Sequence, residues 1–283
     1  MSRIKGIRMS LNTRFFACNT YSYTMSHTAE SCLEHLADLG FREFELMMYP
    51  GHLWPPDIGT AQRTALRALI ERRGLRITTL NMPNVDMNIA GASAQMRRYT
   101  LDLLRQIVEL AGELGAEGVV LGPGKSNPLF AAPRERLNGF FFSALDELVP
   151  VAKNAGTQLW IENMPFAFIP DIDGLMEALD AYGNNELGIV YDVANGHFVG
   201  EDLGVALRRC RARLKLVHLS DTNRTVYRHD PVGAGDLPFG IVPPVLAEIG
   251  HLRLPVLEII SCDADRDLVA SADKLVAMGY VPA

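Results

Sequence analysis

The stretch MRRYTLDLLRQIVELAGELGAEGVVLG, residues 96–122, contains the repeating unit from which the chain is built. Its first part carries apolar residues at helical spacing and ends at Gly115, and glycine is the residue that most often follows the last turn of a helix. The run GVVLG comes almost at once and has the short, apolar composition of a buried strand. An amphipathic helix thus leads directly into a strand.

The same order of helix, glycine and apolar strand recurs along the chain. An opening strand is expected near Arg8–Phe15 and a last helix near Asp265–Met278, and the other expected strands are FREFEL, LRITTL, GVVLG, QLWIE, LGIVYD, LKLVH and LPVLE. Strands that alternate with helices imply parallel pairing through right-handed crossovers. Eight such units over residues 1–283 predict a closed (β/α)₈ TIM barrel, an α/β fold of one domain.

Composition limits the class of protein. The chain has 283 residues and 48% of them are hydrophobic, so it can bury a large core. No apolar run reaches the roughly 20 residues of a membrane span, and the first residues do not resemble a signal peptide. The scattered cysteines are typical of reduced thiols, and the net charge of −6 disfavours a nucleic-acid surface. We expect a cytoplasmic protein with neither membrane nor nucleic acid as a partner.

Four of the expected strands end in a side chain that can bind a metal ion, namely Glu162, Asp192, His218 and Glu258. Side chains alternate between strand faces, so each shares a face with the apolar residue two positions earlier. The carboxyl ends of barrel strands meet at one rim, where three buried acids need a compensating charge. Any one of them alone could be an ordinary polar strand end. Together they predict one divalent ion, with Mn²⁺, Mg²⁺ or Co²⁺ favoured and Zn²⁺ as the alternative.

The motifs around these residues resemble the xylose-isomerase-like TIM barrels. They are IENMP, YDVANGHF, HLSDTNR, GAGDLPF and LEII. This superfamily includes ketose 3-epimerases, hydroxypyruvate isomerase, inosose and dehydroshikimate dehydratases, and endonuclease IV. The resemblance covers essentially the whole chain. It implies that the four residues bind one metal, that Glu162 and Glu258 also move protons on the two sides of a ketose, and that the protein is a dimer or tetramer acting on a small carbohydrate-like substrate.

The resemblance also implies substrate-binding residues. Arg224 stands where epimerase-like members carry an arginine that holds substrate oxygens, and the alternative is a solvated loop charge. Asn195 occupies the position of a substrate-binding histidine in many members, and His197 is the nearest histidine, which could equally be a satisfied loop residue. His229 resembles an extra zinc ligand of endonuclease IV, but Tyr227 replaces the aspartate that should accompany it. His229 is therefore expected to face substrate or to cap a turn.

Further positions near the strand ends are candidates for substrate contact. Glu45, in FREFEL, is expected to point into the barrel lumen beside the substrate, and a buried ion pair is the alternative. Asn12 and Asn81 are expected to hydrogen-bond sugar hydroxyls. The turn GPGKSNP after the fourth strand has glycine amides that can surround an anion, although it lacks the Walker pattern.

Three functions fit these residues. The first is a metal-dependent isomerase or epimerase of a small ketose or α-hydroxy ketone, which removes a proton next to a metal-bound carbonyl. The second is a lyase that dehydrates a cyclic polyol ketone of the inosose or 3-dehydroshikimate type. The third is abasic-site cleavage in DNA, which the acidic net charge and the incomplete set of zinc ligands oppose. We expect the first, and the ligand set alone does not separate it from the second.

Overall fold

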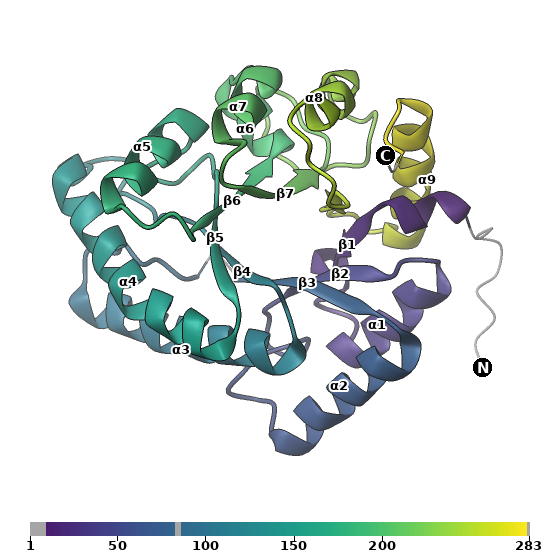
Figure 1. Ribbon diagram of the computed structural model, residues 1–283, viewed down its shortest axis with the longest axis horizontal. Helices are drawn as coiled ribbons and strands as arrows, with labels where there is room; N and C mark the ends of the chain where they lie inside the picture. Colours follow the sequence, from purple (N-terminus) through teal and green to yellow (C-terminus); the bar gives the residue numbers. More distant parts are fainter. Residues whose placement is uncertain (1–9, 83–85, 282–283) are drawn as a thin grey trace.

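The chain folds into a closed barrel of eight parallel strands in a computed structural model that describes residues 10–82 and 86–281. The strands follow chain order around the barrel, and β8 closes it by pairing with β1. Helices surround the strands on the outside (Figure 1). The predicted (β/α)₈ fold is therefore confirmed. Within the described ranges, no helix is both long enough and apolar enough to cross a membrane.

The elements alternate as the repeating unit predicts. The strands are β1 (Ala17–Asn19), β2 (Glu43–Met47), β3 (Arg76–Asn81), β4 (Gly118–Leu121), β5 (Gln158–Glu162), β6 (Gly188–Asp192), β7 (Leu214–Leu219) and β8 (Val256–Leu257). The α-helices are α1 (Ala29–Asp38), α2 (Thr60–Arg73), α3 (Ala94–Leu114), α4 (Arg134–Ala155), α5 (Ile172–Tyr182), α6 (Val193–Val199), α7 (Leu203–Cys210), α8 (Val242–Glu248) and α9 (Ala264–Ala277). Short 3-10 helices are η1 (Leu11–Phe15), η2 (Tyr21–Tyr23) and η3 (Phe239–Ile241).

The prediction of an opening strand near Arg8–Phe15 is wrong. The first two of these residues lie outside the described part of the chain, and most of the rest form η1, while the strand β1 begins only afterwards. Asn12 therefore does not end a strand, and its side chain instead donates to Asp273 at 2.8 Å. Asn19 occupies the end of β1 in its place.

An apolar layer closes the barrel interior. Its members are Ala17, Val120, Trp160, Val190, Leu216 and Val256, which form a cluster separate from the larger core between strands and helices. The last four stand two positions before the four predicted metal ligands, as a strand period of two requires. Trp160 fits because β4 begins with Gly118, where a Cβ atom would lie only 2.6 Å from the indole ring. The ligands thus lie next to this apolar layer, on the side of the carboxyl ends of the strands.

Candidate active site

The four predicted ligands converge at the rim of the barrel that the C-terminal ends of the strands form. One ligand atom from each of Glu162, Asp192, His218 and Glu258 lies within 4.8 Å of the others, and all four residues are buried. The Nδ1 atom of His218 is 3.1 Å from Glu162 Oε1 and 3.0 Å from Glu258 Oε2. Its distance to Asp192 Oδ2 is 3.9 Å. Three carboxylates and one imidazole nitrogen therefore surround a common point.

Asp192 provides the test of whether this cluster suits a cation. Its Oδ1 atom accepts a hydrogen bond from the backbone N–H of Asn195 at the start of α6, at 2.8 Å. Its Oδ2 atom is buried and has no hydrogen-bond partner among the described residues. A buried carboxylate oxygen without a donor is costly, and a cation bound between the four ligand atoms would satisfy it. The residues present fit a divalent ion.

Without a cation, the cluster holds protons instead. Burial raises the pKa of Glu162 to about 7 and that of Glu258 to about 8, although the nearby imidazole opposes both shifts. Burial also disfavours a charge on His218, but the surrounding carboxylates outweigh it, and the pKa of His218 lies well above its ordinary value. A cation that enters the site must therefore displace protons.

Glu45 fixes His218 from the side away from the cluster. Its Oε2 atom is 3.2 Å from His218 Nε2 and accepts from Thr79 at 2.7 Å, while Oε1 accepts from Asn19 at 2.6 Å and Asn81 at 3.1 Å. Burial favours the neutral acid, but His218 and these donors prevail and lower the pKa of Glu45. A charged Glu45 holds the proton on Nε2 and leaves Nδ1 for a cation.

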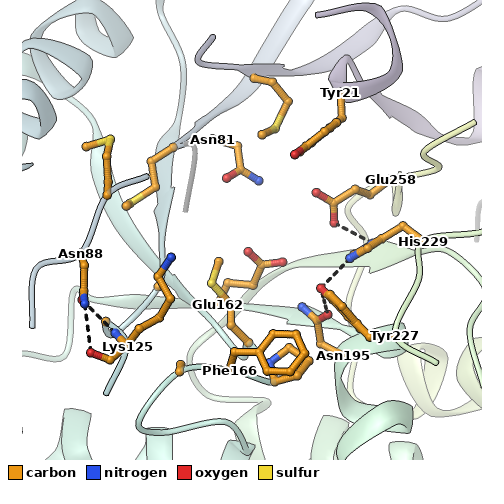
Figure 2. Close-up of a pocket in the computed structure, with 18 of the residues that line it drawn as sticks. Tyr21, Asn81, Asn88, Lys125, Glu162, Phe166, Asn195, Tyr227, His229 and Glu258 are labelled. Carbon is orange, nitrogen blue, oxygen red and sulfur yellow. Dashed lines mark hydrogen bonds and ion pairs between the residues drawn. The ribbon is translucent and has the colours of Figure 1, made fainter. Parts of the chain in front are cut away.

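A pocket of about 390 Å³ opens above the ligands. Of the four ligands, Glu162 and Glu258 line it in the described part of the chain, and Figure 2 shows their carboxylates at its wall. The wall is largely apolar and includes four methionines, and its apolar side chains are those of Met47, Met82, Met87, Ile89, Met164, Pro165, Phe166, Ala167 and Ile260. The pocket thus presents two acids within a mainly apolar surface.

Three polar residues form a connected row on the pocket wall. The hydroxyl of Tyr227 donates to Asn195 Oδ1 at 2.7 Å, so it must accept from His229 Nε2, also at 2.7 Å (Figure 2). The Nδ1 atom of His229 is 3.0 Å from Ser220 Oγ and 3.5 Å from Glu258 Oε2. Burial and the nearby carboxylates raise the pKa of Tyr227, which keeps its hydroxyl protonated. The row therefore has a fixed direction of hydrogen bonding.

A sequence model of the xylose isomerase-like TIM barrel family matches residues 33–272. The chain belongs to this family. The uncharacterized protein MJ1311 of Methanocaldococcus jannaschii is 28% identical over 227 residues, which cover 78% of this chain and 75% of that protein.

Two solved structures share the fold. A D-tagatose 3-epimerase-like protein superimposes with a TM-score of 0.80 at 24% identity, covering 93% of this chain and 96% of the other. The IOLI protein with a bound zinc atom superimposes with a TM-score of 0.76 at 17% identity, covering 92% and 96%. The resemblance drawn from the motifs is thus confirmed at the level of family and fold.

The structure of this family member brings some of the predicted substrate residues to the pocket and not others. Asn195 and His229 line it, whereas Arg224 is exposed and is not among the described lining residues. His197 is buried in α6, 2.7 Å from Asp236, as in the alternative of a satisfied histidine. Glu45 lies outside the lining and forms the buried ion pair with the strand-seven histidine that was its alternative. Substrate contact by these residues stays a prediction.

Several site residues were not predicted. Asn19 was not predicted as a site residue because the opening strand was placed too early in the sequence. The run FFACN does end in a polar residue, as the other strands do. Asn163 brackets the strand-six aspartate: its Oδ1 accepts from the backbone N–H of Asp192 at 2.8 Å, and its Nδ2 donates to the carbonyl of the same residue at 3.1 Å. Tyr227 was considered only as the residue that replaces a zinc-ligand aspartate. Tyr21, which begins η2, and Lys125, in the segment after β4, line the pocket from short segments that show no periodic pattern.

Proposed function

We propose that this protein is a divalent-metal-dependent isomerase or epimerase of a small ketose or related α-hydroxy ketone. The observation that carries the proposal is the ligand cluster at the pocket wall, where the buried Oδ2 atom of Asp192 has no hydrogen-bond donor among the described residues and suits a cation. The fold shared with a D-tagatose 3-epimerase-like protein and with a zinc-containing IOLI protein supports it. We propose in addition that DNA is not a substrate.

The four ligands would have two different tasks. Glu162, Asp192, His218 and Glu258 would hold the ion, which when bound supplies Lewis acidity that makes a C–H bond next to a carbonyl more acidic. Asp192 and His218 are not among the described pocket-lining residues, so their task is to bind the ion. Glu162 and Glu258 reach the pocket from β5 and from the end of β8, and can also exchange protons with a substrate.

Two carboxylates at one substrate carbon account for epimerisation. Glu162 or Glu258 takes the proton from one face of the carbon, and the other carboxylic acid gives a proton to the opposite face. Return of the proton to the neighbouring carbon would instead give an isomer. Asn195, Tyr227 and His229 offer polar atoms that can orient substrate hydroxyls, and the apolar wall keeps water from the reacting carbon.

One observation favours a second candidate function, the elimination of water from a cyclic polyol ketone. His229 lines the pocket and lies 3.5 Å from Glu258 Oε2. An imidazole at that place can protonate a leaving hydroxyl after the carboxylate has removed a proton. The two functions therefore share their first step and differ in the second.

A ¹H-NMR screen in D₂O tests the proposal. Ketoses, inososes and dehydroshikimate are incubated with the protein and Mn²⁺, and loss of an α-proton signal reports exchange, a new sugar spectrum reports epimerisation, and a new vinyl signal reports loss of water. We expect exchange with a ketose, and Glu162→Gln should abolish it and weaken metal binding. The matched control is Glu201→Gln, which makes the same change at a poorly exposed glutamate that is not among the described pocket-lining residues and should leave exchange unchanged.

The outcomes separate the candidates. Exchange that persists at full rate in Glu162→Gln would remove this residue from proton transfer. A vinyl signal would establish the lyase in place of the isomerase. Absence of exchange with every compound in the presence of Mn²⁺, or efficient nicking of abasic DNA, would overturn the proposed function.

A further inference from the structure

We propose that the substrate carries an anionic group and that Lys125 binds this group on the side of the pocket across from Glu258. The inference rests on the proposed function and adds the substrate class. Lys125 is half-buried and lines the pocket, and in Figure 2 its amine points into the cavity across from Glu258 and His229. A ligand long enough to span the pocket would contact both ends.

The backbone of Lys125 is held in place by neighbouring loops. Its N–H donates to Asn88 Oδ1 at 2.8 Å, and Asn88 Nδ2 donates to its carbonyl at 3.0 Å. Lys125 also forms an isolated bridge with Ala167, and the carbonyl of Gly124 accepts from Phe168 N at 2.9 Å. The segment after β4 is thus joined to those after β3 and β5. Because the backbone is already ordered, an anion bound there costs less conformational entropy than one bound by a lysine on a mobile loop.

The glycine before Lys125 allows this close packing. Gly124 has φ of +106°, and a Cβ atom on it would lie 2.5 Å from the Cβ of Ala90. Any other residue would strain the backbone and push the segments apart. In the GPGK turn, the backbone N–H of Lys125 donates to Asn88 Oδ1, and the side chain of this lysine lines the pocket.

The charges at the two ends of the pocket have opposite signs. Glu162 and Glu258 are acidic lining residues, with Asp192 and Glu45 buried nearby, and Lys125 lines the wall across from Glu258. The apolar side chains between them screen charge poorly, so an anionic substrate group is repelled from the acidic end and attracted to the ammonium. Burial lowers the pKa of Lys125, and exposed Asp86 opposes this shift, so a bound anion would stabilise the charged amine further. These charges favour the orientation in which the anionic group of the substrate meets Lys125.

The substrate class follows from these two ends. The acidic end requires a carbonyl next to a hydroxyl, as in the proposed function, and the Lys125 end requires a carboxylate or a phosphate. The side chain of Asn88 has little hydrogen-bonding capacity left for a ligand. Its oxygen accepts from two backbone N–H groups, and its nitrogen donates to a backbone carbonyl. The geometry points to a ketose that is also a sugar acid or a sugar phosphate.

Calorimetry on the full-length protein with Mn²⁺ tests the assignment with three ketoses. They are D-fructose, which is neutral, 5-keto-D-gluconate, which carries a carboxylate, and D-fructose 6-phosphate. We expect at least one anionic compound to bind about tenfold or more tightly than D-fructose, since a charge-assisted hydrogen bond contributes at least that factor. The tighter of the two identifies the anion.

Substitutions assign the preference to one residue. Lys125→Met should reduce the preference to about threefold or less, and Lys125→Arg should retain most of it. Lys153→Met is the matched control, because it removes the same charge from an exposed site on α4 outside the pocket, and it should leave the preference intact. Equal affinity for all three ketoses, no measurable binding of either anion, or a preference that survives Lys125→Met would overturn the assignment.

The test separates this inference from the proposed function. Binding affinity is measured without turnover, so a preference for anions that depends on Lys125 can be detected even if no compound exchanges its α-proton. Absence of exchange together with such a preference would count against the proposed chemistry alone. Conversely, neutral ketoses that exchange in D₂O and bind as tightly as the anionic ones would leave the proposed function standing and refute the role of Lys125.

Discussion

Glu45→Gln changes a residue outside the pocket lining and should nevertheless weaken cation binding. Each oxygen of Glu45 accepts two hydrogen bonds, and the substitution replaces one oxygen by an NH₂ group that can only donate. On the Oε1 side this group would face the amides of Asn19 and Asn81, which also donate. On the Oε2 side it would face the hydroxyl of Thr79, which can rotate to accept, and Nε2 of His218. The second arrangement is the one that the site can accommodate.

That arrangement moves the proton of His218 to the wrong nitrogen. Nε2 must then accept from the new amide, so the neutral imidazole carries its proton on Nδ1, the atom that a cation requires. His218 is fully buried, so water cannot replace the lost interaction. Groups that orient a metal-bound histidine typically change metal affinity by about 10–100-fold, and we expect a loss of that size. The lost charged hydrogen bond should also cost about 1–3 kcal/mol of unfolding free energy.

Calorimetric titration of metal-free protein with Mn²⁺ measures the effect. Glu201→Gln is the matched control, because Glu201 is also a poorly exposed glutamate whose pKa burial raises to about 7. It accepts from Ile172 N–H at 2.8 Å and from Tyr191 OH at 3.3 Å, and an amide can keep both contacts. Its Mn²⁺ affinity should match that of the unmodified protein. If Glu45→Gln binds Mn²⁺ within about threefold of the unmodified protein, Glu45 does not set the tautomer of His218.

Three further predictions concern stability and metal binding. Because burial raises the pKa of Glu162 and Glu258 from 4.5 to about 7 and about 8, their protonated forms stabilise metal-free protein at low pH, and this contribution is lost as the pH rises through these values. The Tm of chelator-treated protein should therefore fall between about pH 4.5 and about pH 8, and the gain in Tm on adding Mn²⁺ should grow over that range. Asp192→Asn should weaken Mn²⁺ binding by at least about tenfold in calorimetric titration, because it removes a charged candidate ligand, while the amide oxygen can still accept from the Asn195 N–H. Gly118→Ala should lower the free energy of unfolding by about 1–3 kcal/mol in urea titrations, because its Cβ atom would lie 2.6 Å from the ring of Trp160. Gly139→Ala is the control, because a Cβ atom there meets no described atom within 4 Å, and it should raise the free energy of unfolding by up to about 1 kcal/mol.

The fold was predictable where helix and strand periods are long enough to read. The helix that ends at Gly115 has that glycine in the left-handed conformation at φ of +70°, and β5 coincides with the predicted strand Gln158–Glu162. The opening strand was misplaced because β1 has three residues, too few to show alternation, and follows a 3-10 helix of mixed composition. Parallel partners on both sides determine β1, and this information lies far away in the sequence.

The ligand cluster was predictable for the same reason, and the pocket wall was not. At the end of a strand, the alternation of side chains fixes the direction in which each side chain points. The segment after β7 has no such alternation. There the side chain of Asn223 accepts from Thr225 N–H and Val226 N–H, both at 2.8 Å, and closes a tight turn. Arg224 lies exposed within this turn, while Tyr227 just beyond it reaches the pocket. Local hydrogen bonds between side chain and backbone determine such a turn, and the spacing of apolar residues does not predict it.

Helix α6 accounts for the difference between Asn195 and His197. It was not predicted because Asp192 both ends β6 and caps the helix that follows at once. Residues two apart on a helix point to different sides, so Asn195 faces the pocket and His197 faces Asp236. The direct passage from strand to helix therefore determines which of the two residues lines the pocket.

The anchoring of the ligands gives Glu162 a distinct place in the cluster. Asp192 is tied to the backbone of α6, His218 to Glu45, and Glu258 to Asn19 at 3.2 Å. For Glu162, the described residues supply one side-chain hydrogen bond, to His218 itself. If a cation bound that imidazole nitrogen, the Glu162 carboxylate would be the least restrained of the three, and it faces the pocket. Under the proposed function the proton-abstracting base needs such freedom, so Glu162 would be better suited than Glu258 to take the first proton.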